Sequence, residues 1–230
     1  MPIIQDDEFG KITIRRSARA SQVRLRVAPD GTLRASLPLY APTFLVKRLI
    51  KSSRDELREL LALAQPIAEY VDGMQVGKSH TLIVRPTAGS LQINRRAQQI
   101  IISLPEDRSL KDSDVVREVR DAVISALRLE AKSYLPKRLS FLATKYGWHY
   151  RKVRFSHASG RWGSCTSEGT ISLNIALMKL PFELIDYVII HELAHTEEMN
   201  HSATFWDVVA IGDPQYKDHR LRLKREAPTI

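Results

Sequence analysis

The stretch HELAHTEEMNH, residues 191–201, determines which fold and chemistry the rest of the chain is expected to have. It holds two histidines four residues apart, a glutamate directly after the first, and a third histidine six residues after the second. Histidine is a mediocre helix former, so helix propensity does not explain this cluster. Residues four apart on a helix differ by about 40° in direction, so His191 and His195 are expected to face one ion together.

Three neutral imidazole nitrogens with an open fourth position are typical of a catalytic zinc site. Asn200 can turn the chain back after the helix, which would bring His201 to the same ion from outside it. Glu192 is expected beside the ion, as a general base acting on zinc-activated water that attacks a carbonyl carbon. We therefore predict Zn²⁺ as the cofactor, His191, His195 and His201 as its ligands, and Glu192 as the catalytic base.

A bare HExxH motif also occurs in unrelated helices, where its histidines are exposed or hydrogen-bonded. Here the preceding residues LIDYVII (184–190) are apolar on nearly every side, so the helix is expected to be buried. Burying two histidines and a glutamate without partners is costly, and a metal ion removes that cost. The metzincins share the spacing HExxHxxxxxH, but this chain has Glu198 in place of their glycine and no methionine after His201.

The composition is that of an ordinary globular protein, with 230 residues, 43% hydrophobic and 27% charged. The start, MPIIQDDEFGK, is acidic and unlike a signal peptide. The most apolar stretch, residues 184–194, is short and carries charged side chains, so no membrane span is expected. The single cysteine, Cys165, excludes an internal disulfide and a cysteine-built zinc site. These features predict a cytoplasmic protein.

Periodicity divides the chain into two parts. In the first part, alternation predicts strands and a three- to four-residue period predicts one helix. The predicted strands are 11–17, 22–28, 32–38, 80–86, 90–94 and 98–105, and the predicted helix is 42–65. The segment 105–114 is the best linker candidate. Beyond it we predict a long helix to Gly147 that is kinked or restarted at Pro136, a hairpin over 151–174 with its turn at 167–169, and a helix over 181–199.

Four further motifs occur in a specific order: RWGSC (161–165), GTISLN (169–174), PFELIDYVIIHELAH (181–195) and EMNHSATFW (198–206). Together they resemble the YgjP-like metallopeptidase family, predicted metal-dependent hydrolases related to the SprT-like and WLM-type zincins. The resemblance is strongest over residues 150–206. One departure is Gly160, where a polar or basic residue is expected.

The resemblance implies a minimal zincin core, with a short sheet whose edge lies over the metal. The predicted fold class is therefore α+β: an N-terminal mixed β-sheet and helix region, residues 1–106, followed by a zincin-like catalytic domain, residues 107–230. An edge strand within 161–165 or 171–174 is expected to hold an extended peptide by backbone pairing.

Supporting roles at the site have several candidates: Glu198, Arg161, Tyr216, His157 and His219. Glu198 lies three residues after His195 and is a candidate to orient that ligand, or else it is a surface residue at the helix end. Arg161 and Tyr216 are candidates to stabilise the transition state, and a plain surface role competes with each. Trp162, Phe205 and Trp206 are expected to be core aromatics beside the site.

The predicted function is zinc-dependent hydrolysis, with a peptide or protein as the substrate. One alternative is an amidase or another hydrolase of a non-peptide substrate. A second alternative is a nucleic-acid-associated protein, because residues 1–100 hold 16 Lys and Arg against 9 Asp and Glu within a chain of net charge +9. The competing interpretation of that charge is a basic surface that serves solubility alone.

Overall fold

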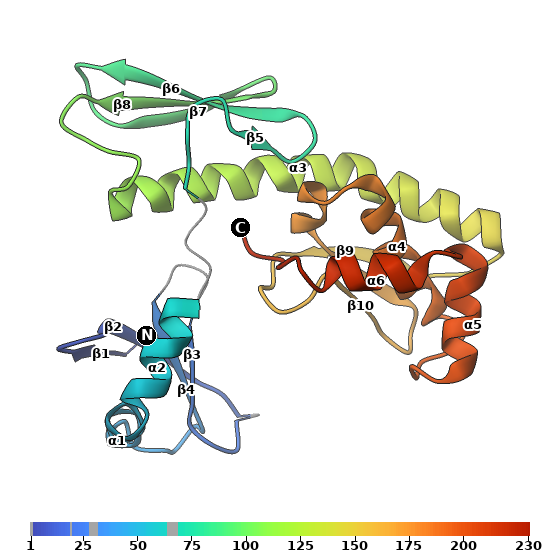
Figure 1. The fold of residues 1–230 in the computed structure, drawn as a ribbon, viewed down its shortest axis with the longest axis horizontal. Helices are drawn as coiled ribbons and strands as arrows, with labels where there is room; N and C mark the ends of the chain where they lie inside the picture. Colours follow the sequence, from blue (N-terminus) through green and yellow to red (C-terminus); the bar gives the residue numbers. More distant parts are fainter. Residues whose placement is uncertain (1, 19, 28–31, 64–68) are drawn as a thin grey trace. The chain divides into compact units, whose positions relative to one another are not determined.

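The computed structural model describes residues 2–18, 20–27, 32–63 and 69–230, and its fold is α+β (Figure 1). The chain divides into two compact units, Met1–Glu69 and Tyr70–Ile230. Each unit encloses a hydrophobic cluster of its own. The predicted fold class is confirmed.

The first unit is a four-stranded sheet covered on one face by two helices. Its elements are β1 (Ile3–Asp6), β2 (Gly10–Arg16), β3 (Arg24–Val27), β4 (Leu33–Leu37), α1 (Phe44–Ser52) and α2 (Arg54–Leu63). The strand order is β1-β2-β4-β3, with β2 and β4 parallel and the other pairs antiparallel. Alternate strand residues such as Ile12, Ile14 and Leu33 are buried against Val46 and Ile50 of α1. The residues between them face away from the helices.

Two expectations for this unit need correction. The single helix predicted over 42–65 is two helices that meet at Ser53, and β1 was not predicted. Pro66, predicted to end the helix, lies outside the described residues. The predicted hairpin of 22–38 is confirmed by the antiparallel pairing of β3 with β4.

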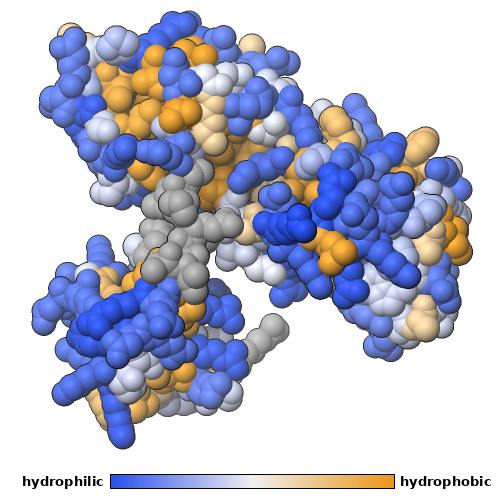
Figure 2. Space-filling model, in the orientation of Figure 1, coloured by the Kyte–Doolittle hydropathy of each residue, from blue (hydrophilic) through white to orange (hydrophobic). Residues whose placement is uncertain are grey.

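The second unit begins with another four-stranded sheet, which packs on one long helix. The strands are β5 (Gln75–Val76), β6 (His80–Thr87), β7 (Gln92–Arg96) and β8 (Gln99–Pro105), in the order β5-β6-β8-β7. Leu82, Ile100 and Ile102 are fully buried in one cluster with residues of helix α3 (Ser113–Tyr146). Figure 1 shows α3 running along this sheet and continuing past it to helices α4–α6. Figure 2 shows hydrophobic surface over the same sheet.

Helix α3 is 34 residues long and runs through Pro136 as one element, so the predicted restart does not occur. Gly147 ends it in the left-handed conformation, with φ of 73°, as predicted. No helix in the described part of the chain is both long and apolar enough to cross a bilayer.

The remaining elements surround α3's C-terminal half. They are β9 (Lys152–Ser156), β10 (Gly163–Cys165), β11 (Thr170–Asn174), the 3₁₀ helix η1 (Ile175–Lys179), α4 (Phe182–Ala194), α5 (Ala203–Gly212) and α6 (Tyr216–Leu223). β10 and β11 form an antiparallel hairpin, which confirms the turn predicted at 167–169. β11 also pairs with β9 in parallel and is the central strand. Of the two predicted edge strands, only 161–165 therefore contains one.

The compact units divide between residues 69 and 70, whereas the domain boundary predicted from the sequence lies after residue 106. The sheet of residues 75–105 buries its apolar face against α3, so it belongs to the same core as the residues that follow it. That residues 107–230 are a catalytic domain stays a prediction.

Candidate metal centre

Helix α4 carries His191, has His195 as its C-cap and is buried on nearly every side, as predicted. It ends at Ala194, five residues before the predicted end. The cause lies at Thr196, whose backbone N–H and hydroxyl both donate to the Leu193 carbonyl, at 2.8 and 2.7 Å. Such three-residue bonds tighten the last turn and release the chain from the helix axis. His195 keeps helical backbone angles, so it still faces the side that His191 faces.

The turn after α4 brings the third histidine back to the first two. Potential ligand atoms of His191, His195 and His201 all lie within 4.8 Å of one another. The Nε2 atoms of His191 and His201 are 3.2 Å apart. Ser202 then starts α5 by accepting a hydrogen bond from the Phe205 N–H. Phe205 is fully buried, with its ring 4.5–5.0 Å from all three imidazoles, and so forms an apolar floor under them.

For His195 and His191 the surroundings favour the form that binds a metal ion. The Nδ1 of His195 is 3.2 Å from the Glu198 carbonyl, which can only accept, so Nδ1 carries the proton and Nε2 is free. Burial, with the neighbouring His195, His201 and Arg220 charges, lowers the pKa of His191 to about 3. The imidazole therefore stays neutral, which is the form that binds metals.

The distance between the imidazole nitrogens also fits a bound metal ion. Two nitrogens bound to one tetrahedral zinc ion at about 2.0–2.1 Å would lie about 3.3 Å apart. The observed separation of the His191 and His201 nitrogens, 3.2 Å, matches that value. The donor set present therefore fits a metal ion.

Glu192 projects from α4 beside this cluster and is 5% exposed. Its Oε2 atom is buried and has no hydrogen-bond partner in the described structure. Burial raises the pKa of Glu192 to about 8, against the opposing effect of the Arg161 charge. Its carboxyl group faces Gly163 of β10 so closely that a Cβ atom there would lie 2.5 Å from Oε1. A glycine at this position thus leaves room for the glutamate.

The structure places three of the five supporting candidates, Glu198, Arg161 and Tyr216, differently. Glu198 contacts the site through its backbone carbonyl, while its side chain accepts from the Asn200 N–H at 3.1 Å. Arg161 is exposed, two residues before the start of β10, and its charge acts on Glu192. Tyr216 stacks on Trp206 at 5.4 Å, and Trp206 in turn lies 5.9 Å from the His191 and His201 rings. Tyr216 is thus separated from the histidines by one aromatic ring.

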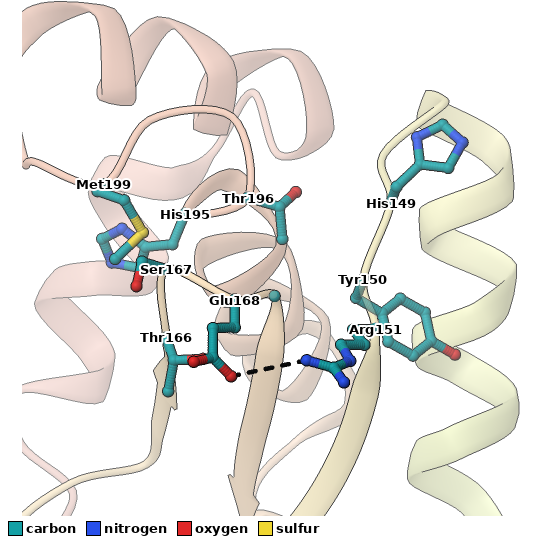
Figure 3. Close-up of a pocket in the computed structure, with 10 residues that line it drawn as sticks. His149, Tyr150, Arg151, Thr166, Ser167, Glu168, His195, Thr196 and Met199 are labelled. Carbon is teal, nitrogen blue, oxygen red and sulfur yellow. Dashed lines mark ion pairs between the residues drawn. The ribbon is translucent and has the colours of Figure 1, made fainter.

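A pocket of about 400 Å³ opens next to His195 (Figure 3). One wall is the β10–β11 turn, residues 166–169, and the other is the segment 149–151 that follows α3. Arg151 and Glu168 form an ion pair across it at 3.7 Å, with both side chains about three-quarters exposed. Thr196 and Met199 complete the lining.

A second buried polar cluster, which was not predicted from the sequence, is centred on Glu130 of α3. Its carboxylate accepts bonds from the Lys78 and Ser79 N–H groups at 2.7 and 2.9 Å, the Ser79 hydroxyl at 2.7 Å and His80 Nδ1 at 2.6 Å. His80, expected to be incidental, is buried in this cluster. Lys78 also donates to the Leu180 carbonyl, just before α4. These hydrogen bonds therefore connect the β5–β6 turn to α3 and to the segment just before α4.

A further buried pair, Asp213 with His219 at 2.7 Å, joins the C-cap of α5 to the middle of α6. The His219 ring lies 6.3 Å from Tyr187 of α4, which is 6.1 Å from the His191 ring. His219 is therefore a structural partner of Asp213, two ring contacts away from the histidine cluster.

Comparison with known proteins gave one family and one solved structure. The profile described as YgjP-like, metallopeptidase domain, matches residues 21–226. A crystal structure of the metallopeptidase zymogen of Pyrococcus abyssi abylysin is 29% identical, with a TM-score of 0.36, over 38% of this chain and 90% of that one. No curated protein matches the chain.

Proposed function

The chain belongs to the YgjP-like metallopeptidase family, and from this premise we propose that it is a zinc-dependent peptidase. His191, His195 and His201 hold the metal, and Glu192 is the general base. The observation that carries the proposal is the convergence of three imidazoles within 4.8 Å beside a buried carboxyl group that has an unpartnered oxygen.

A zinc ion held by the three imidazoles would supply Lewis-acid chemistry, lowering the pKa of a water to about 7 and polarising a carbonyl. Glu192 takes up a proton at Oε2 and returns it to the leaving amine. Burial raises the pKa of Glu192 to about 8, and the charge of Arg161 opposes that rise. Gly163 leaves the carboxyl group free to point at the reacting atoms.

The proposed substrate is an extended peptide, because β10 is an edge strand directly above α4 and its glutamate. An edge strand offers unpaired backbone groups along which a peptide adds as a further strand. Pairing of this kind reads little of the substrate's sequence, so selectivity falls to flanking pockets such as the one next to His195. A cytoplasmic location stays a prediction.

The experiment that tests the metal assignment is elemental analysis of protein purified without added metal. The wild type is expected to carry about one zinc per chain. His201→Ala is expected to lose most of it while keeping its fold, because His201 is an exposed residue outside α4. Equal metal content in both proteins would refute the three-histidine site. A different ion in the wild type would keep the ligands and change the metal, since similar donor sets accept several ions.

The peptidase assignment needs its own assay, with unfolded proteins and peptides as substrates. Cleavage that needs both the metal and Glu192 supports the proposal. A fully metal-loaded protein that cleaves small amides but no peptide of any length would favour the hydrolase alternative.

A further inference from the structure

The first unit has a group of exposed basic side chains that the proposed peptidase reaction does not involve. Its sheet has helices on one face only, and the opposite face carries five exposed basic side chains: Lys11, Arg15, Arg24, Arg26 and Arg34. Strand pairing places them together. Arg24 and Arg15 both pair with Ser36, and Arg26 pairs directly with Arg34. We call these five residues the basic sheet face.

Spacing follows from sheet geometry. Arg24 and Arg26 alternate along one strand and are therefore about 6.6 Å apart, while Arg24 and Arg15 stand two strands apart, or about 9.6 Å. The cations thus cover a field that spans three neighbouring strands rather than a single line.

Two of the acidic residues that the structure describes in this unit lie on its helical side. Asp6 and Glu8 bind Arg54 and Arg58 of α2 on the helical side, at 3.1 and 2.5 Å. No carboxylate stands on the basic sheet face among residues 2–18, 20–27 and 32–37. Within the same ranges Arg15, Arg24 and Arg26 form no ion pair. Within those ranges the basic sheet face therefore carries cations without carboxylates, which a surface serving solubility alone does not require.

This placement works against the stability of the sheet. On this face Arg24 lies about 6.6 Å from Arg26 and about 9.6 Å from Arg15, and like charges at that range repel. A bound polyanion removes the repulsion, so the face is best matched to a partner with repeated negative charge.

An aromatic side chain stands next to this field. Tyr40, which is 96% exposed, lies in the turn that follows β4. Arg16 holds that turn beside the end of β2, through bonds to the Leu39 and Ala41 carbonyls at 2.6 and 2.8 Å. Tyr40 therefore lies at the end of the sheet next to the row that contains Arg15 and Arg24.

We propose that the basic sheet face binds single-stranded nucleic acid, with its arginines on the phosphates and Tyr40 stacked on a base. Four of the five cations are arginine, whose planar guanidinium bonds two phosphate oxygens at once and also stacks on bases. A flat cationic sheet with an exposed aromatic ring suits single strands, whose bases are free to stack. This surface is independent of the metal centre.

The test is fluorescence anisotropy of the full chain with a labelled oligothymidylate of about 20 nucleotides, longer than the ~4–16 that comparable single-strand sites cover. Binding is expected to weaken steeply from about 50 mM to about 200 mM salt, with a log–log slope of about −0.7 per phosphate contact. Arg24→Thr/Arg26→Thr keeps strand-forming residues, and is expected to lower affinity at least about tenfold and the slope by about 1.4.

The matched control is Lys47→Ala/Lys51→Ala, which removes two exposed charges from α1 on the helical layer. It is expected to change affinity less than about threefold. Equal losses in the two double variants would overturn the proposal, because they would show binding by net charge alone. Unchanged far-UV circular dichroism in both variants keeps the comparison free of folding effects.

Two further measurements distinguish a single-stranded nucleic acid from a duplex and from an anionic membrane. Tyr40→Ala is expected to lower affinity for the oligothymidylate at least about fivefold and to leave a duplex of the same length less affected. Vesicles of phosphatidylserine and phosphatidylcholine are expected not to compete with the oligonucleotide. No oligonucleotide binding at low salt, or vesicle binding that Arg24→Thr/Arg26→Thr abolishes, would overturn the proposal.

Discussion

Gly163 and Glu192 face each other between β10 and α4, so a change at either residue tests the same contact. Glu192→Gln keeps the shape of the side chain and removes its ability to take a proton. We expect it to retain its metal and to lose about 10²–10⁴-fold in peptide cleavage. Elemental analysis and a cleavage assay on one preparation check both parts, and residual activity within tenfold of the wild type would rule out this base.

Gly163→Ala places a methyl group where the Glu192 carboxyl group lies. Because α4 is buried, the side chain has to move or the strand has to shift, at a cost of about 1–3 kcal/mol in unfolding free energy. We expect cleavage to fall far more than metal content does. The matched control is Gly160→Ala, since no atom lies within 4 Å of the added carbon there. Similar activities for the two variants would contradict the proposed role of Gly163.

At the scale of the elements, Glu130 joins α3 to the β5–β6 turn. Glu130→Ala would leave several buried donors without an acceptor, and we expect it to lower the free energy of unfolding by about 3–5 kcal/mol. Urea unfolding at neutral pH measures the change. The control, Glu118→Ala, removes an exposed carboxylate from the same helix and should fall within about 0.5 kcal/mol of the wild type.

The same carboxylate makes stability depend on pH. Burial raises the pKa of Glu130, but bonds from Lys78, His80 and Ser79 outweigh it and hold the pKa below its ordinary value of 4.5. As the pH falls, Glu130 therefore takes up a proton in the unfolded chain before it does so in the folded chain. The free energy of unfolding that the carboxylate contributes is complete above pH 4.5 and is lost as the pH falls through the lower pKa of the folded state. We expect the stability gap between the wild type and Glu130→Gln to narrow below that pH. Urea titrations down to about pH 3, below the ordinary pKa of glutamate, measure this. A difference in the free energy of unfolding that stays constant over that range would contradict the proposed role of Glu130.

Local sequence patterns identified most elements but not how they are arranged. The helix of residues 182–194 could be predicted because its run of apolar residues favours a buried helix. The cap at Gly147 could be predicted because glycine tolerates a positive φ. The early end of that helix could not, since it depends on the Thr196 hydroxyl bonding back to Leu193. The cluster of three histidines was expected from spacing alone. The contact between Gly163 and Glu192 joins segments nearly thirty residues apart, and no local signal reports such a contact.

At the scale of the whole molecule, two separate hydrophobic clusters predict two units that fold on their own. We expect residues 70–230, expressed alone, to unfold cooperatively and to bind as much metal as the full chain. A fragment of residues 107–230 should not, because it lacks the Leu82, Ile100 and Ile102 side chains that cover α3. At about 1.5–3 kcal/mol for each buried side chain, the loss exceeds what a marginally stable fold tolerates. Cooperative unfolding of the shorter fragment would instead support the predicted boundary at residue 106.

The position of His201 has a consequence for how fast an ion would exchange. Two of the three histidines belong to a buried helix and its cap, whereas His201 is exposed on the segment between α4 and α5. Opening that segment would break one bond to the ion without unwinding the helix, so release is a local event. A chelator should therefore strip the protein at a rate that mild denaturant leaves unchanged. The stripped protein should keep its helical circular dichroism and reload on mixing.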